Sequence, residues 1–193
     1  VACREAGLAG RDYVAGLVRE AGLSVTVDFA GNVIGRKSGS DAALEPLMLG
    51  SHIDSVPSGG NFDGQVGSVG AVEVARTLAD HGIELRHPLE VVIFTNEEGG
   101  KTGSRAWIGQ VERSELEIVT ASGHTIGEGL RLVGGDPDRL NEIRRQEGAV
   151  AAFLELHIEQ GGVLEAENIE IGVVEGIVGI KRWNVTLEGA ANH

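Results

Sequence analysis

Three apolar runs of this chain end at, or within two residues of, acidic or imidazole side chains, and helical segments lie between them. The runs cover residues 44–50, 89–95 and 149–157, and a helix is expected over residues 66–81. Runs that are apolar throughout are typical of buried strands, and their alternation with helices is typical of α/β folds. Open α/β sheets place their sites at the carboxyl ends of strands. The sequence therefore predicts an α/β domain with a functional site at one end of its buried strands.

Further elements frame this pattern. Apolar spacing predicts a helix over residues 10–21, and alternation predicts a hairpin of strands 24–28 and 32–36. We expect further helices over residues 104–111 and 136–147, and strands of a more exposed sheet over residues 169–174 and 181–188. Because strand character changes from buried to alternating near residues 176–179, a domain boundary is expected there.

Composition excludes several classes of partner. The chain has 193 residues and a formal net charge of −13, so neither nucleic acid nor an anionic membrane is expected as a partner. The one cysteine, Cys3, allows no internal disulfide, which fits a reducing, cytoplasmic location. No apolar run approaches the roughly 20 residues of a membrane span, and no signal peptide is evident. Because the chain starts at Val1 and ends at His193 without an evident end signal, we expect it to be part of a longer polypeptide.

The first chemical cluster joins His52, Asp54 and Asp63. In an extended segment positions two apart face the same way, so Asp54 is expected to fix the tautomer of His52 and leave its other nitrogen for a metal. Asp63 lies in a turn between Gly60 and Gly64, where a tightly held carboxylate is able to bridge two cations. Taken alone, the first pair reads as a surface histidine beside a solvated aspartate, and the second segment as an ordinary Asp-Gly turn.

The second cluster comprises Glu97, Glu98 and His157. Two adjacent carboxylates after an apolar strand repel each other, and a cation removes that cost. One of them is able to ligate while the other takes a proton from a metal-bound water. Each feature has a structural alternative, a solvated acidic turn or a histidine satisfied at a strand end. Their joint occurrence at equivalent strand ends favours a metal site with nitrogen and oxygen ligands, which suits zinc, manganese or cobalt.

These residues belong to motifs that resemble the hydantoinase/carbamoylase family of amidases. That family includes N-carbamoyl-L-amino-acid hydrolases and allantoate amidohydrolases, within the wider group of dinuclear metallopeptidases. The resemblance extends over nearly the whole chain, and the matching segments are residues 50–57, 60–64, 96–99, 156–161, 176–180 and 189–193.

The resemblance implies a role for each matched residue. It implies that His52, Asp63, Glu98 and His157 bind two divalent metals, zinc or manganese, with cobalt or nickel possible in their place. Glu97 would be the general base, and Asp54 would support His52. Gln160 would contact substrate, and His193 would stabilise the oxyanion and contact substrate from a neighbouring subunit. The peptide between Asp63 and Gly64 would be cis.

The resemblance also implies a fold and an assembly. It implies a zinc-exopeptidase-like catalytic domain with a mixed sheet and helices on both faces. Residues 1–176 would form the N-terminal part of this domain, and residues 177–193 the truncated start of an inserted α+β lid and dimerisation domain. The full-length protein would be a homodimer, and the chain alone would be inactive.

The implied reaction is hydrolysis of the carbamoyl or ureido C–N bond of N-carbamoyl-L-amino acids or allantoate-like ureido acids. One alternative is an N-acyl-amino-acid or dipeptide hydrolase of the same group, and another is a non-catalytic metal-binding fragment. The sequence departs from the family after Gly99, where residues 100–102 replace an Arg-Phe pair and a longer loop. Access to the base is therefore expected to differ.

Overall fold

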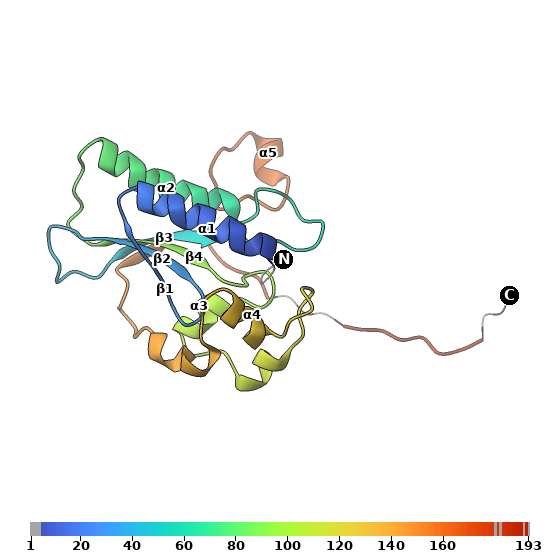
Figure 1. Cartoon of the computed structure of the whole chain (residues 1–193). Coiled ribbons are helices and arrows are strands. Elements are labelled where there is room, and N and C mark those ends of the chain that lie inside the picture. The colour runs from blue at the N-terminus through green and yellow to red at the C-terminus, as the bar shows by residue number, and fades with distance from the viewer. Residues whose placement is uncertain (1–4, 180, 182, 191, 193) are drawn as a thin grey trace. The chain divides into compact units, whose positions relative to one another are not determined.

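A five-stranded mixed sheet forms the centre of residues 1–158 (Figure 1). In the computed structural model, which describes residues 5–179, 181, 183–190 and 192, the strand order is β1-β2-β4-β3-β5. The strands are β1 (Ser24–Val27), β2 (Val33–Lys37), β3 (Leu47–His52), β4 (Leu89–Phe94) and β5 (Ala152–Leu154). The hairpin β1–β2 and the pair β2–β4 are antiparallel, whereas β3 runs parallel to both β4 and β5. The carboxyl ends of β4, β3 and β5 therefore lie side by side, as the sequence predicts.

Helices cover both faces of this sheet (Figure 1). The long helices α1 (Glu5–Glu20) and α2 (Gln65–Asp80) lie on one face, and the other face carries α3 (Thr102–Trp107), α4 (Ile126–Leu132), and the 3-10 helices η1 (Arg113–Glu117) and η2 (Pro137–Ile143).

Successive residues of β4 supply the two cores. Val91 and Ile93 pack with α1 and α2, whereas Val92 packs with Met48 and Trp107 on the opposite face. Successive side chains of a strand point to opposite faces, so a strand that is apolar throughout needs a cover on each side. The predicted mixed sheet with helices on both faces is confirmed.

Two predicted elements differ in extent or type. The run 149–157 forms only the three-residue strand β5, whose residues are exposed, because it pairs with β3 along a single edge. The segment 136–147 begins at the predicted cap, where Asp136 accepts a hydrogen bond from the Asp138 amide, but it forms the 3-10 helix η2. The prediction of a third buried strand was therefore wrong in length and burial.

Residues 159–193 form a second unit. Its helix α5 (Val163–Glu167) begins where the Glu159 carboxylate accepts hydrogen bonds from the amides of Val163 and Leu164, at 2.7 and 2.9 Å. Among the described residues of 169–174 and 181–188 there is no strand, so the strands predicted there are not found. An alternating pattern forms a strand only when a neighbouring strand completes the ladder, and no described strand pairs with these segments.

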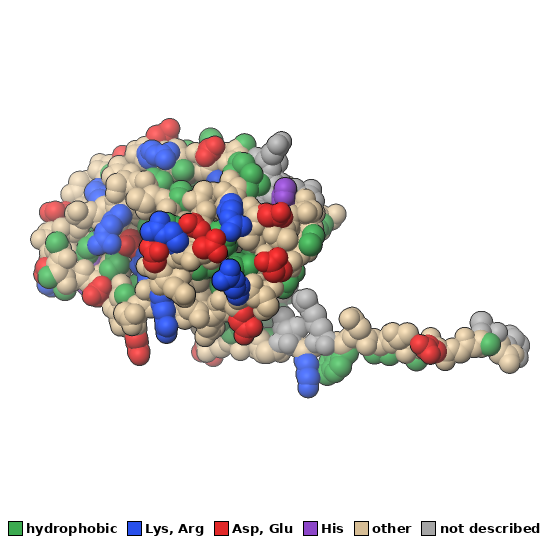
Figure 2. Space-filling view, turned by 60° about the horizontal axis from the view of Figure 1, so that its bottom comes forward, with side chains coloured by type: hydrophobic (Ala, Val, Ile, Leu, Met, Phe, Trp, Pro, Cys, Tyr) green, Lys and Arg blue, Asp and Glu red, His purple; other side chains and the backbone are tan. Residues whose placement is uncertain are grey.

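Neither unit contains, in its described residues, a helix with the length and apolar character needed to cross a membrane. On the face shown in Figure 2, acidic and basic side chains are interspersed and form no single basic patch.

Candidate metal centre

The carboxyl ends of β3, β4 and β5 bring predicted site residues together within residues 1–158. The Oδ1 atom of Asp63 lies 3.0 Å from Nε2 of His157 and 3.6 Å from Nε2 of His52. Nε2 of His52 also lies 3.8 Å from Oε2 of Glu97. One ligand atom each from His52, Asp63 and His157 fits within 4.8 Å of the others, which is the spacing of a cation site. The structure thus assembles residues that are more than 100 positions apart in the chain.

His52 is fixed on all sides by its surroundings. It is the last residue of β3 and is 2% exposed, and its carbonyl accepts a hydrogen bond from Ser68 Oγ at 2.8 Å. Gly64, at the start of α2, has a φ of +78° and packs directly on the imidazole, since a Cβ there would lie 2.4 Å from the ring. Glycine at position 64 therefore leaves the ring room to stand where its Nε2 faces Asp63.

The tautomer of His52 is set differently from the sequence prediction. Nδ1 lies 2.9 Å from the main-chain oxygen of Asp54, whereas the Asp54 carboxylate is 3.7 Å away. A main-chain oxygen only accepts, so Nδ1 is the donor in this contact, and Nε2 is the nitrogen that faces Asp63. The Asp54 carboxylate instead accepts hydrogen bonds from the amides of Glu97 and Glu98, both at 3.2 Å. Asp54 therefore joins the end of β3 to the acidic loop after β4.

The peptide between Asp63 and Gly64 is trans, in contrast to the expected cis form. The positive φ of Gly64 makes the tight turn into α2 without a cis bond.

Glu97 and Glu98 lie in the loop between β4 and α3. The loop turns at Asn96, whose φ is +53°, and the Asn96 side-chain amide donates to Thr102 Oγ1 at 2.9 Å. Burial raises the pKa of Glu98, and the negative charges of Asp63, Glu97 and Asp54 raise it further, while His52 opposes them. The site therefore holds more negative charge than its histidines balance.

This donor set fits divalent cations. It offers imidazole nitrogens and carboxylate oxygens without thiolate, and Asp63 presents Oδ1 between the two Nε2 atoms. A cation would relieve the repulsion that raises the Glu98 pKa. Asp63 lies within 3.6 Å of both imidazoles, and Oε2 of Glu97, in the loop after β4, lies 3.8 Å from Nε2 of His52. Of the three histidines outside the clusters, His81 and His124 are exposed and His87 is half-buried.

The roles of the predicted site residues stay predictions, and two of these residues are not placed at the site by this geometry. Gln160 belongs to the second unit, so its contact with substrate stays a prediction, and His193 lies outside the described residues. A pair that the sequence prediction left without a role does lie at the site. Ser51 Oγ donates to the Glu155 carboxylate at 2.5 Å and connects β3 to the segment after β5. The only sequence signal for it is that Glu155 shares the strand parity of His157.

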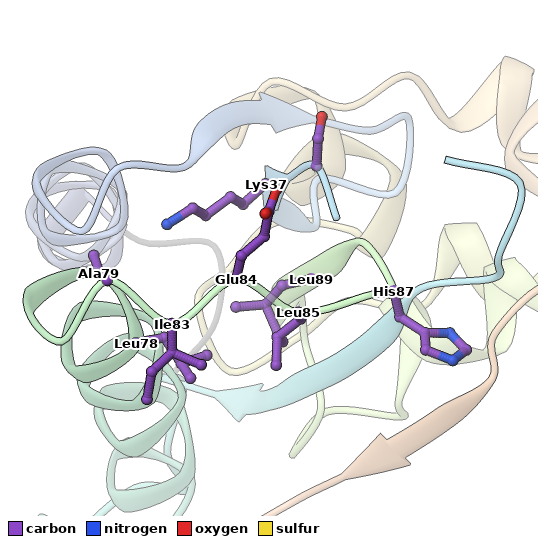
Figure 3. A pocket seen from close by; sticks show the side chains of 10 residues that line it. Lys37, Leu78, Ala79, Ile83, Glu84, Leu85, His87 and Leu89 are labelled. Atoms are coloured by element: carbon purple, nitrogen blue, oxygen red, sulfur yellow. The ribbon is translucent and has the colours of Figure 1, made fainter. Parts of the chain in front are cut away.

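Of two cavities in this unit, one is lined by residues of the candidate site and the other is not. A cavity of about 860 Å³ is lined by Glu97, Glu155 and Ser51 together with aromatic and basic side chains, among them Trp107 and Arg145. A smaller one of about 250 Å³ lies at the opposite end of the sheet, where Lys37 and Leu89 pair (Figure 3). The second cavity has an apolar floor and contains none of the predicted site residues.

Comparison with known proteins gives the family. The model of peptidase family M20/M25/M40 matches residues 48–192, three quarters of the chain. The chain belongs to this family. The family is typically metal-dependent, in agreement with the donor set described above.

The family's relatives confirm the resemblance inferred from the motifs. An N-carbamoyl-L-amino acid amidohydrolase of Geobacillus stearothermophilus is 46% identical over 188 residues, which cover 95% of this chain and 46% of that protein. A ureidoglycolate hydrolase of Oryza sativa subsp. japonica is 38% identical over 192 residues, covering 95% and 40%. A crystal structure of an amidase of the hydantoinase/carbamoylase family from Burkholderia multivorans matches with a TM-score of 0.76 at 42% identity, covering 87% and 41%. The chain thus spans less than half the length of these relatives.

Proposed function

We propose that the whole protein carrying this chain hydrolyses the carbamoyl or ureido C–N bond of small ureido acids, with two divalent cations, zinc or manganese. The observation that carries the proposal is the position of Asp63 Oδ1 between two imidazole Nε2 atoms, beside the Glu97–Glu98 loop. The relatives named for N-carbamoyl-amino-acid and ureidoglycolate hydrolysis support the bond type.

Each predicted residue would have a separate role. His52 and Asp63 would hold one cation, and Asp63, Glu98 and His157 would hold the other. Bound divalent cations polarise a carbonyl and lower the pKa of water. Glu97 takes the proton from the attacking water as general base and gives it to the leaving nitrogen.

Glu97 is suited to this role by its surroundings. Its side chain is 29% exposed and lines the cavity of about 860 Å³, so it is open to a substrate. Its amide is held by Asp54, and its carboxylate lies 3.8 Å from the His52 ring and 3.8 Å from Lys101 Nζ. These contacts hold the carboxylate at the edge of the metal centre without burying it.

The remaining roles rest on the resemblance alone. We propose that Gln160 contacts the substrate, that His193 stabilises the oxyanion, and that residues 177–193 begin a lid and dimerisation domain. We also propose a cytoplasmic homodimer. Sedimentation of the whole protein tests the dimer, and a monomer at working concentration would refute it.

A substrate panel tests the reaction. The whole protein, loaded in turn with Zn²⁺ and Mn²⁺, is assayed on N-carbamoyl-L-amino acids, allantoate, N-acyl-amino acids and dipeptides. Ammonia release from the carbamoyl or ureido substrates supports the proposal. Cleavage restricted to dipeptides or N-acyl-amino acids would replace it with the alternative reading.

Substitution Glu97→Gln tests the base. We expect turnover to fall by about 10²–10⁴-fold, because an amide cannot take the proton, while the metal content stays that of the unaltered protein. The matched control is Glu73→Gln on the exposed side of α2, which should change neither quantity. Turnover within threefold of the unaltered protein would rule out the general-base role.

A further inference from the structure

The loop that carries Glu97 and Glu98 is held at its base by a side chain from a distant part of the sequence. We infer that Asn32, which follows the β1–β2 turn, is a positioning residue that fixes this loop against the end of the sheet. The inference rests on the proposed function for its effect on turnover, but its structural part does not depend on it.

The Asn32 side chain connects the residue that precedes the Glu97–Glu98 loop to a residue that follows it. It is fully buried, and its Oδ1 accepts a hydrogen bond from the amide of Thr95 at 3.0 Å. Its Nδ2 donates to the carbonyl of Gly103 at 3.2 Å. Thr95 precedes the loop and Gly103 follows it, so one side chain sets the separation of both ends.

Asp28 fixes the orientation of this amide. One Asp28 oxygen accepts from the Asn32 amide nitrogen of the main chain, and the other accepts from Asn32 Nδ2, both at 2.9 Å. That second oxygen also accepts from Trp107 Nε1 at 2.6 Å, which ties α3 to the same carboxylate. Because a carboxylate only accepts, the Asn32 side chain must present its NH₂ group here and its oxygen to Thr95.

Other contacts close the loop between these anchors. Gly103 donates its amide to the Thr95 carbonyl at 2.9 Å, and Thr102 donates its amide to the Asn96 carbonyl at 3.2 Å. Asp54 accepts the amides of Glu97 and Glu98 at the tip. Asn32 at the base of the β4–α3 loop and Asp54 at its tip therefore fix the positions of Glu97 and Glu98.

Only a side-chain amide supplies both the acceptor for Thr95 and the donors for Gly103 and Asp28. Aspartate lacks the two donors and would place a second carboxylate at 2.9 Å from that of Asp28. There is also no spare room, because a Cβ at Gly103 would lie 2.1 Å from Asn32 Oδ1 and 2.7 Å from the Thr95 nitrogen. Gly103→Ala therefore displaces the same contact from the opposite side.

The experiment uses both substitutions, Asn32→Asp and Gly103→Ala, each with a matched control. Asn141→Asp changes an exposed asparagine, and Gly16→Ala adds a methyl group with no atom within 4 Å. Amide hydrogen exchange is measured in the 193-residue chain without metal, and kcat and KM are measured in the metal-loaded whole protein. If Asn32→Asp does not fold, Gly103→Ala provides the test.

We expect the amides of residues 97–103 to exchange at least tenfold faster in both test variants, with those of α2 unchanged. We expect kcat to fall at least tenfold with KM within twofold, and both controls to match the unaltered protein. Exchange of residues 97–103 at the unaltered rate in either folded test variant would overturn the inference. Faster exchange in a protein that hydrolyses no carbamoyl or ureido substrate would instead refute the proposed function and leave the inference standing.

Discussion

Gly64→Ala is the substitution that most sharply tests how the fold holds His52. The new Cβ would lie 2.4 Å from His52 Cε1, so the ring must move by about 1 Å to regain an ordinary contact distance of 3.4 Å. The ring is 2% exposed and packs against the start of α2, so it has little room to move. Position 64 also has a φ of +78°, which is unfavourable for a residue with a Cβ.

The clash and the unfavourable backbone conformation both lower the free energy of unfolding. A left-handed conformation costs an L-residue about 1–2 kcal/mol, and overpacking a filled site costs about 1–3 kcal/mol. We therefore expect a loss of about 2–5 kcal/mol in the free energy of unfolding. A displacement of about 1 Å exceeds the tolerance of about 0.2 Å in metal–ligand distances, so Zn²⁺ binding should weaken by about 10–100-fold.

The assay compares this variant with Gly60→Ala. Gly60 lies in the same loop, but a Cβ there has no atom within 4 Å and its φ is not positive, so a change within about 0.5 kcal/mol is expected. Urea unfolding without metal gives the stability, and calorimetric titration with Zn²⁺ gives the affinity. If the two variants match in both quantities, Gly64 does not position His52 and the reasoning is wrong.

Two further predictions concern charge. Because the pKa of Glu98 is raised from its usual value of 4.5, its ionisation disfavours the metal-free fold as pH rises through that raised pKa. Glu98→Gln should therefore stabilise the metal-free chain at pH 7 in urea unfolding, with the gain vanishing below pH 4.5. The same substitution should weaken metal binding. Equal stability at pH 7 would refute the destabilisation of the charged carboxylate by burial and by Asp63. Arg145 and Arg36 both donate to the buried Glu90 carboxylate, at 2.8 and 2.7 Å. Arg145→Met removes one charged hydrogen bond and leaves the other, so it should lower the free energy of unfolding by about 1.5–3 kcal/mol, while Arg113→Met at the exposed surface should not. A loss below about 0.5 kcal/mol for Arg145→Met would show that Glu90 does not need it.

The sequence predicts those elements that are set by local pattern. The buried strand β4 and helix α2 follow from apolar periodicity, and the edge strand β5 does not, because burial of an apolar run depends on what lies beside it. Helix α4 was missed although Thr125 and Glu128 form a capping box at its start. That Thr-x-x-Glu spacing was a readable signal.

The residues of the candidate site also differ in how far the sequence predicts their placement. The proximity of His52 and Glu97 could be predicted from their positions at or just after strand ends, since parallel strands bring those ends together, whereas Asp63 was predicted from its glycine-flanked turn. The main-chain contact that sets the His52 tautomer could not, because it depends on the local path of the backbone. The same holds for Asn32, whose partners at Thr95 and Gly103 are set by the packing of a hairpin against a loop.

The most direct test of the central claim is an anomalous diffraction experiment on crystals of the chain grown with Zn²⁺. The account predicts an ion bound by Asp63, Glu98 and His157, at about 2.0–2.2 Å from their donor atoms, with weaker occupancy beside His52. Zn²⁺ bound elsewhere on the chain, with no anomalous peak between Asp63 and His157, would contradict it.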